Sequence, residues 1–199
     1  MVKLDLGQNQ LHRLPSINAL RSLKELYLDT NNFEELPQGI ESFGELEALY
    51  LNSNKFKILP DGIGALSTLK VLGLSENELS TIPQGIGNLK DLNVLDVTDN
   101  KLGSLPQGVL GLEQLEELYM HGNPCTTPFQ LGTLPSLREI LLYNRSSQNV
   151  ASFPEKYKVR KPLSTPDTTL LPQLKSLSLD WAKFTQLPQE IRERLYRVR

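Results

Sequence analysis

The sequence has little cysteine and little histidine. Its 199 residues include one cysteine, Cys125, and two histidines, His12 and His121. A single cysteine cannot form a disulfide within the chain, whereas small extracellular domains usually carry paired cysteines, so we expect a reducing, cytoplasmic compartment. The two histidines lie far apart in the sequence and no Cys/His cluster has metal-ligand spacing. We therefore expect no metal site and no cofactor.

Long hydrophobic runs are also missing. No stretch approaches the roughly 18 consecutive apolar residues that a membrane-spanning helix needs. The chain begins Met1-Val-Lys-Leu-Asp-Leu, which lacks the apolar core and the cleavage site of a secretory signal. Asn144-Arg145-Ser146 matches the glycosylation motif, but such a short motif often arises by chance. The sequence predicts a chain without a membrane span and with this asparagine unmodified.

What the sequence has instead is a repeat with a period of 23 residues. The repeated pattern is Leu-x-x-Leu-x-Leu-x-x-Asn, followed by an apolar residue and then by a Leu-Pro or Ile-Pro pair. Its asparagines are Asn31, Asn54, Asn77, Asn100 and Asn123, with a truncated copy around Asn9. One such unit cannot bury its own apolar edge, so the copies must stack into a solenoid.

Each part of the repeat has a physical interpretation. The alternating x-Leu-x-Leu-x segment predicts a short strand with its leucines inward. The asparagine amide both donates and accepts, so it can satisfy backbone groups where the chain leaves the strand. Proline then starts a return segment, since it cannot donate to a ladder. Apolar residues preceded by glycine should anchor that segment on the convex side: Ile40, Ile63, Ile86 and Val109 after Gly39, Gly62, Gly85 and Gly108.

This pattern resembles the leucine-rich repeat family over residues 2–142 and again over roughly 171–192. The 23-residue Leu-Pro variant is similar to the intracellular, Ras-suppressor-like subgroup, and similar repeats occur in bacterial effectors. The resemblance implies an α/β solenoid shaped as an arc. Its concave face would carry a parallel sheet of about eight short strands, and its convex side would be irregular or 3-10 helical. It also implies protein binding, with small-GTPase signalling as one setting.

Three parts follow from where the pattern breaks. Residues 1–142 are predicted to be leucine-rich repeats, and residues 143–172 an inserted loop rich in proline with a basic run at 156–161. Residues 173–199 are predicted to hold a final repeat and a C-terminal helical cap. The segment Val2–Leu6 already follows the strand pattern. Because an open strand edge favours aggregation, we expect an upstream segment or a pairing partner to cover it.

Charge is divided unevenly along the chain. Residues 1–137 hold nine Lys and Arg against seventeen Asp and Glu, and residues 138–199 hold twelve against six. Such segregation suggests different partners or roles at the two ends. The basic residues near the C-terminus are interpreted as a solvated surface rather than a nucleic-acid site.

The strand residues that flank the inward leucines should form the working surface. They include four of the six tyrosines and several carboxylates, which predicts an acidic concave face with aromatic islands. Exposed aromatics dominate binding hot spots, although they are also simply favoured in strands. Such a face should attract a basic protein and repel nucleic acid. The predicted partner-binding residues are Tyr27, Asp29, Tyr50, Asp96, Glu117, Tyr119, His121, Glu139, Tyr143 and Trp181.

The sequence offers no catalytic constellation. Asp61-Gly-Ile-Gly64 lacks the lysine of a phosphate loop, and no nucleophile or oxyanion donor accompanies His121. Cys125 falls at a core position of the repeat and is interpreted as a small buried residue. We therefore expect no catalysis and no catalytic residue. Two functions remain open: a binding module of intracellular signalling, or the substrate-recognition part of a larger enzyme (a kinase or ubiquitin ligase) or a pathogen effector.

Overall fold

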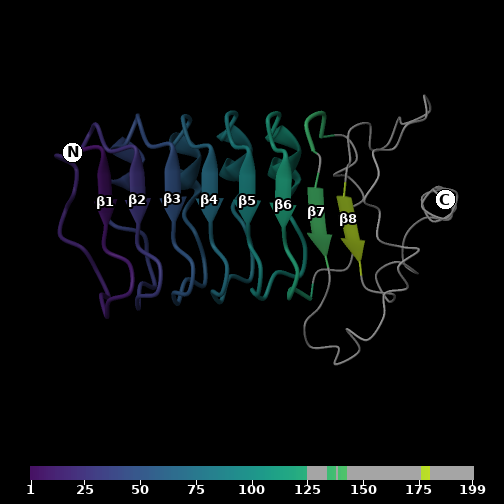
Figure 1. The fold of residues 1–199 in the computed structure, drawn as a ribbon, viewed down its shortest axis with the longest axis horizontal. Helices are drawn as coiled ribbons and strands as arrows, with labels where there is room; N and C mark the ends of the chain where they lie inside the picture. Colours follow the sequence, from purple (N-terminus) through teal and green to yellow (C-terminus); the bar gives the residue numbers. More distant parts are fainter. Residues whose placement is uncertain (125–133, 138, 143–175, 180–199) are drawn as a thin grey trace, which may run out of the picture.

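The computed structural model describes residues 1–124, 134–137, 139–142 and 176–179. Its strands form one eight-stranded parallel sheet in which each strand pairs with the next along the chain (Figure 1). The strands are β1 (Lys3–Asp5), β2 (Glu25–Tyr27), β3 (Ala48–Tyr50), β4 (Val71–Gly73), β5 (Val94–Asp96), β6 (Glu117–Tyr119), β7 (Glu139–Leu142) and β8 (Ser176–Leu179). The predicted leucine-rich-repeat architecture with about eight short parallel strands is confirmed.

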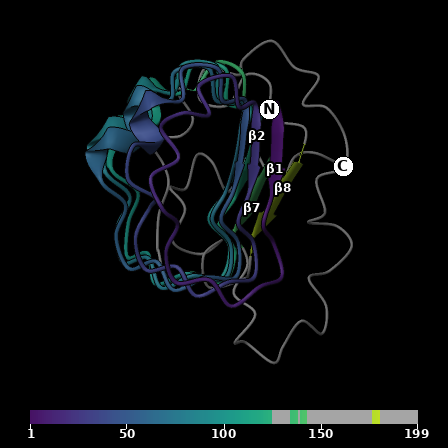
Figure 2. The ribbon, with the colours of Figure 1, turned by 90° about the vertical axis from the view of Figure 1, so that its left-hand side faces the viewer.

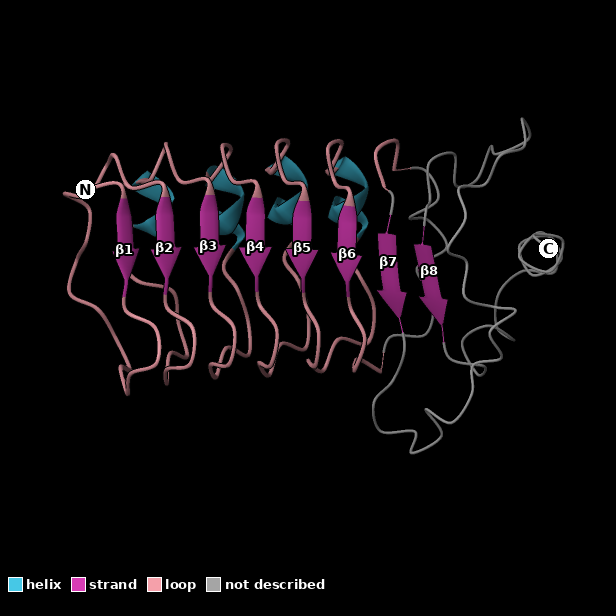
Figure 3. Ribbon diagram, in the orientation of Figure 1, coloured by secondary structure: helices cyan, strands magenta, loops and turns pink. Residues whose placement is uncertain are grey.

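Short 3-10 helices occupy the side opposite the sheet. They are η1 (Ile40–Ser42), η2 (Asp61–Ala65), η3 (Gln84–Asn88) and η4 (Gln107–Gly111). Seen along the solenoid, the strands lie on one side of each coil and these helices on the other (Figure 2). The repetition of strand and 3-10 helix along the described coils is clear in Figure 3. Each coil thus passes once through the sheet and returns along the far side, as the period predicts.

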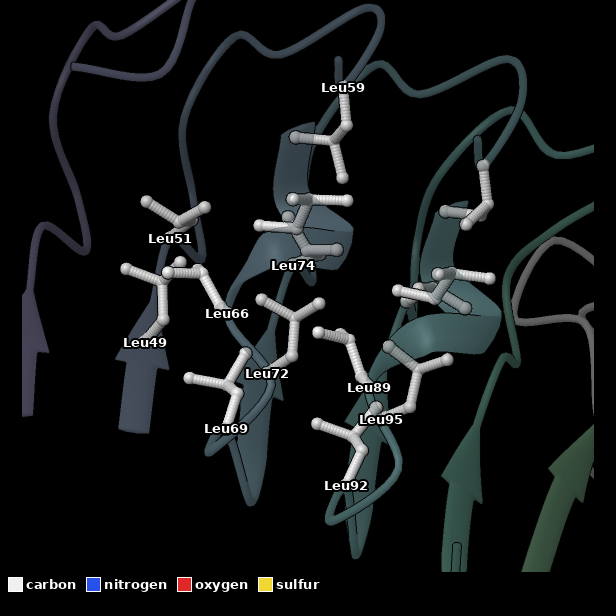
Figure 4. Close-up of a cluster of buried hydrophobic side chains, with 14 of the residues drawn as sticks. Leu49, Leu51, Leu59, Leu66, Leu69, Leu72, Leu74, Leu89, Leu92 and Leu95 are labelled. Atoms are coloured by element: carbon white, nitrogen blue, oxygen red, sulfur yellow. The ribbon is translucent and has the colours of Figure 1, made fainter. Parts of the chain in front are cut away.

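Leucines from both sides of the coil meet between the sheet and the helices. Leu49, Leu72 and Leu95 lie opposite one another on β3, β4 and β5 and are fully buried. Figure 4 shows them packed with Leu66 and Leu89, which approach from the return segments. The predicted convex anchors Ile40, Ile63, Ile86 and Val109 are also buried. Burying one leucine side chain stabilises the folded state by about 1.5–3 kcal/mol. This continuous row of buried leucines therefore holds the coils together.

The repeated asparagines connect neighbouring coils. Asn54 donates from Nδ2 to the carbonyl oxygen of Leu28 in the preceding coil, at 2.9 Å, and to that of Leu51 in its own coil, at 3.1 Å. Its Oδ1 accepts from the backbone N–H of Phe33 at 3.0 Å. Equivalent bonds recur at Asn31, Asn77, Asn100 and Asn123. The predicted role of the amide is confirmed.

The residue before each asparagine has a left-handed backbone. Its φ is 54° at Thr30, 51° at Ser53, 54° at Glu76 and 50° at Asp99. Glycine fills this position only at Gly122, with φ 72°. A β-branched residue tolerates this region poorly, so Thr30 stores local strain.

The glycines before the convex anchors serve different purposes. Gly39 has φ 84°, which requires glycine, and a Cβ on Gly85 would lie 2.6 Å from the carbonyl oxygen of Asp61. At Gly62 nothing lies within 4 Å of where a Cβ would be, so no close approach requires glycine there. The coils approach one another closely at some glycines and leave open space at others.

Several predictions concern residues outside the described part of the chain. The inserted loop at 143–172, the C-terminal helical cap, Cys125, Tyr143 and Trp181 all fall there. In the parts that the structure describes, no helix has the length and apolar character to cross a membrane. The same parts contain no group of three or more His, Cys, Asp or Glu side chains able to hold a metal ion.

Candidate binding face of the sheet

Outward side chains of the strands form three parallel rows. The first row consists of Lys3, Glu25, Ala48, Val71, Val94 and Glu117, and the central row of Asp5, Tyr27, Tyr50, Gly73, Asp96 and Tyr119. The third row follows the strand ends and consists of Gly7, Asp29, Asn52, Ser75, Thr98 and His121. The 23-residue period therefore places seven of the predicted binding residues in these rows. The backbone position of an eighth, Glu139 on β7, pairs with Glu117.

Two tyrosines of the central row stack. The rings of Tyr27 and Tyr50 have centroids 4.6 Å apart and planes inclined by 13°. The Nζ of Lys3 lies 4.2 Å from the ring centroid of Tyr27, on β1's side of the stack, and 3.7 Å from the carboxylate of Glu25. Burial and the hydrogen bond to Glu25 raise the pKa of the Tyr27 hydroxyl. Strand pairing thus brings a cation against the first of two stacked aromatic rings.

The tyrosine hydroxyls are not equivalent. Tyr27 donates to Glu25 at 3.1 Å and Tyr119 donates to Glu117 at 2.6 Å, in each case two residues back along the same strand. Tyr50 has Ala48 at that place, which offers no side-chain acceptor. The hydroxyls of Tyr27 and Tyr119 are therefore fixed by their own strand, and that of Tyr50 is not.

A chain of hydrogen bonds runs along the third row. The Asp29 carboxylate accepts from the backbone N–H of Asn52 at 3.0 Å and from its Nδ2 at 2.7 Å. Asn52 Oδ1 in turn accepts from the backbone N–H and the hydroxyl of Ser75, both at 2.9 Å. Burial raises the pKa of the Asp29 carboxyl, while the bonds from Asn52 oppose that rise. These contacts fix Asp29 as a half-buried carboxylate at the edge of the face.

The third row ends in a buried pair. Thr98 is 6% exposed and His121 is 9% exposed, and Thr98 Oγ1 lies 3.2 Å from His121 Nδ1. Asp96 Oδ1 accepts from the backbone N–H of Thr98 at 2.9 Å. His121, which the sequence placed among the binding residues, therefore offers little surface. The structure places it in the same row as Asp29 but leaves its side chain buried.

Acidic groups outnumber lysines on this face. The described rows contain one lysine, Lys3, and five carboxylates: Asp5, Glu25, Asp29, Asp96 and Glu117. Elsewhere several lysines are paired between coils, as in Lys24 and Lys70, whose Nζ atoms lie 2.9 and 2.7 Å from Glu47. Those two lysines lower the pKa of Glu47 to about 2. The face of the sheet thus carries a local excess of carboxylates over lysines.

Sequence reasoning missed an apolar strip in the first row. Ala48, Val71 and Val94 lie opposite one another on β3, β4 and β5, and both valines are half-buried. The repeat could have predicted this strip, since these three residues are also 23 apart in the sequence. The first row is therefore apolar at its centre and charged at its two ends.

Comparisons with known proteins agree with this geometry. A family model described as "Leucine-rich repeat region" matches residues 61–161, and one described as "Leucine rich repeat" matches residues 21–79. A search of curated proteins finds no match to the sequence.

Solved structures show the same architecture. A leucine-rich repeat protein of Leptospira interrogans is 35% identical over 72% of this chain and 43% of its own, with a TM-score of 0.62. The leucine-rich repeat domain of the type III effector XopL is 26% identical over 71% of this chain and 52% of its own, with a TM-score of 0.66. A TDR receptor is 30% identical over 70% of this chain and 26% of its own, with a TM-score of 0.63. The chain thus spans about half or less of each of these structures.

Proposed function

The chain belongs to the leucine-rich repeat family, and we propose that it binds another protein through the three rows on the face of its sheet and catalyses no reaction. The family match and the similarity to receptor and effector structures support a role in protein interaction. The lone cysteine favours the cytoplasm, and the repeat subgroup favours signalling, including that of small GTPases.

The observation that carries this proposal is the arrangement of the central row. Tyr27 and Tyr50 are stacked, and Tyr119 is held by Glu117 at 2.6 Å. Rings that are already ordered lose little conformational entropy when a partner covers them. The half-buried valines of the first row add apolar contact area beside them. A surface that combines ordered aromatics with an apolar centre is typical of protein interfaces.

The charge of the face selects the class of partner. Five carboxylates and one lysine would attract a basic protein surface and accelerate its association at low ionic strength. The same charges would repel the phosphates of a nucleic acid. We propose a basic protein as the partner, and no nucleic acid on this face.

Affinity capture with matched variants tests the proposal. Wild-type protein, the double variant Tyr50→Ala/Tyr119→Ala and the control Ile58→Ser would be immobilised and exposed to the same lysate. Ile58 is 65% exposed and lies in the return segment, away from the three rows. The proposal predicts a protein that wild type and Ile58→Ser retain and the double variant loses. Equal retention by all three would overturn binding through this face.

A second candidate is an effector that sequesters a host protein. The similarity to the XopL domain supports it, because that domain is part of a type III effector and this chain spans 52% of it. The substrate-recognition part of a kinase or ubiquitin ligase would present the same kind of surface. The open reading frame around this sequence separates these roles: an adjoining catalytic domain supports substrate recognition, and a secretion signal of an effector supports sequestration.

A further inference from the structure

A cation lies at one end of the stack of Tyr27 and Tyr50. On β1, Lys3 places its Nζ 4.2 Å from the ring centroid of Tyr27, next to the carboxylate of Glu25. On the other side of the stack, Tyr50 is followed in the central row by Gly73, which has no side chain to cover its ring. The chain thus provides its own cation for one ring face and leaves the opposite one without a partner from the central row.

A carboxylate lies on the far side of Gly73 from Tyr50. Asp96 follows Gly73 in the central row, so the side chains of Tyr50 and Asp96 project from strands two positions apart. Adjacent strands are about 4.8 Å apart, which separates β3 from β5 by about 10 Å. That distance accommodates one ammonium or guanidinium group between an aromatic ring and a carboxylate. One oxygen of Asp96 accepts the Thr98 N–H at 2.9 Å, which fixes the orientation of the carboxylate.

The Asn52 amide forms the base of the space between Tyr50 and Asp96. The Asn52 amide lies over Gly73, within 2.8 Å of where a Cβ would be, and is held there by Asp29 and Ser75. The half-buried Val71 and Val94 lie beside it in the first row. A long side chain that brings a cation to Asp96 can rest its methylene stem against these valines.

We propose that Tyr50, Gly73 and Asp96 form a subsite for one basic side chain, an arginine or lysine, of a protein partner bound across the sheet. This inference rests on the proposed protein-binding function and specifies which residue of the partner the centre of the face recognises. The cation stacks on the Tyr50 ring and pairs with Asp96, as Lys3 does with Tyr27 and Glu25. The valines receive the aliphatic part of the same side chain.

Peptide titrations monitored by NMR test the subsite directly. Blocked pentapeptides Gly-Ser-X-Ser-Gly, with X arginine, lysine or the neutral isostere citrulline, would be added to full-length protein labelled on its tyrosine rings and its backbone amides. The subsite predicts saturable shifts of the Tyr50 ring resonances with arginine and lysine. Citrulline should bind at least about fivefold more weakly, because it keeps the shape of arginine but replaces the charged guanidinium with a neutral urea group.

Two pairs of variants identify the groups responsible. Asp96→Asn should weaken arginine binding about fivefold or more, and Asp5→Asn should leave it unchanged. Asp5 is a matched control, since it lies in the same row and accepts a backbone N–H two residues on, from Gly7 at 3.1 Å. Tyr50→Phe keeps the ring and should retain binding, whereas Tyr50→Leu should lose it, with the Gly73 amide as the reporter in both.

Three results would overturn the subsite: citrulline binding as tightly as arginine, Asp5→Asn weakening binding as much as Asp96→Asn, or no saturable shift at Tyr50. Failure of the subsite would leave the proposed function standing if lysate capture still depended on the sheet face. Failure of capture, by contrast, would remove the proposed function itself.

Discussion

Asn54 donates from its amide to the carbonyl oxygen of Leu28, 2.9 Å away and 26 residues earlier in the chain. The same side chain accepts from Phe33 of that coil and donates to Leu51 of its own, so one amide satisfies buried groups of two coils. Asn9 has the same place in its own repeat, but its amide donates only within its coil, to Leu6 and Gly7, at an exposed position. The Asn54 amide therefore connects two coils, whereas the Asn9 amide stabilises only the turn of its own coil.

This contrast predicts unequal costs of removing the two amides. Asn54→Ala leaves the buried Phe33 N–H unpaired and removes one of the two amides that donate to the Leu28 carbonyl, the other being that of Asn31. The loss should lower the free energy of unfolding by about 1–3 kcal/mol. Asn9→Ala removes exposed bonds only and should cost less than about 1 kcal/mol. Urea denaturation followed by circular dichroism measures both, and equal losses would show that the amides do not connect the coils.

Thr30 should be replaceable with a gain in stability. Its φ of 54° is unfavourable for a β-branched residue, whereas asparagine visits this region readily. Thr30→Asn should raise the free energy of unfolding by about 0.5–1 kcal/mol. Thr81 has no positive φ, so Thr81→Asn should bring no gain in the same denaturation experiment. A loss of stability at Thr30→Asn would place the strain elsewhere.

Gly73→Ala should destabilise the third row. The new Cβ would lie 2.8 Å from the Asn52 amide and push it away from Asp29 and Ser75, at a cost of about 1–3 kcal/mol. Gly103 is the control, because nothing lies within 4 Å of its would-be Cβ. Gly103→Ala should leave the melting temperature unchanged or raise it. Tolerance of alanine at both positions would contradict the close approach of Asn52.

Glu47 gives the solenoid a pH-dependent contribution. Lys70 and Lys24 lower its pKa from 4.5 to about 2 in the folded protein. A carboxyl whose folded pKa is depressed stabilises the fold above its unfolded pKa, and this stabilisation is lost as pH falls toward the folded value. Wild type should therefore be more stable than Glu47→Gln at pH 6, and the difference should shrink between pH 5 and pH 2.

Glu45→Gln is the matched control for this pH dependence, since Glu45 appears in none of the ion pairs of the described residues. Its difference from wild type should stay small over the same pH range. Thermal melts of the three proteins in steps of one pH unit make the comparison. A constant gap between wild type and Glu47→Gln down to pH 2 would contradict the paired carboxylate.

The period made most of the fold predictable. Since Asn54, Asn77 and Asn100 share one spacing, the strands, the inward leucines and the amide ladder all followed from the sequence. Side-chain geometry could not be predicted. The burial of His121 beside Thr98 and the position of the Asn52 amide over Gly73 depend on contacts between coils. The sequence also could not predict the open space at Gly62, because glycine permits a close approach of the backbone without requiring it.

The candidate face was predictable in its rows but not in its working parts. Alternation predicted that Tyr27, Tyr50 and Tyr119 occupy the same position on their strands, and the register confirms that they share the central row. The distinction among them came only from their partners two residues back, where Glu25 and Glu117 bind a hydroxyl and Ala48 does not. Function depends on such differences between copies, whereas a repeat pattern shows what the copies have in common.

Binding of the captured partner to the matched set of sheet-face variants tests the central claim most directly. Isothermal titration at two salt concentrations would compare wild type, Ile58→Ser and Tyr50→Ala/Tyr119→Ala. We predict that the double variant raises Kd by about thirtyfold or more, the equivalent of about 2 kcal/mol, with Ile58→Ser unchanged and all affinities falling with salt. A folded double variant that binds as tightly as wild type would contradict the account.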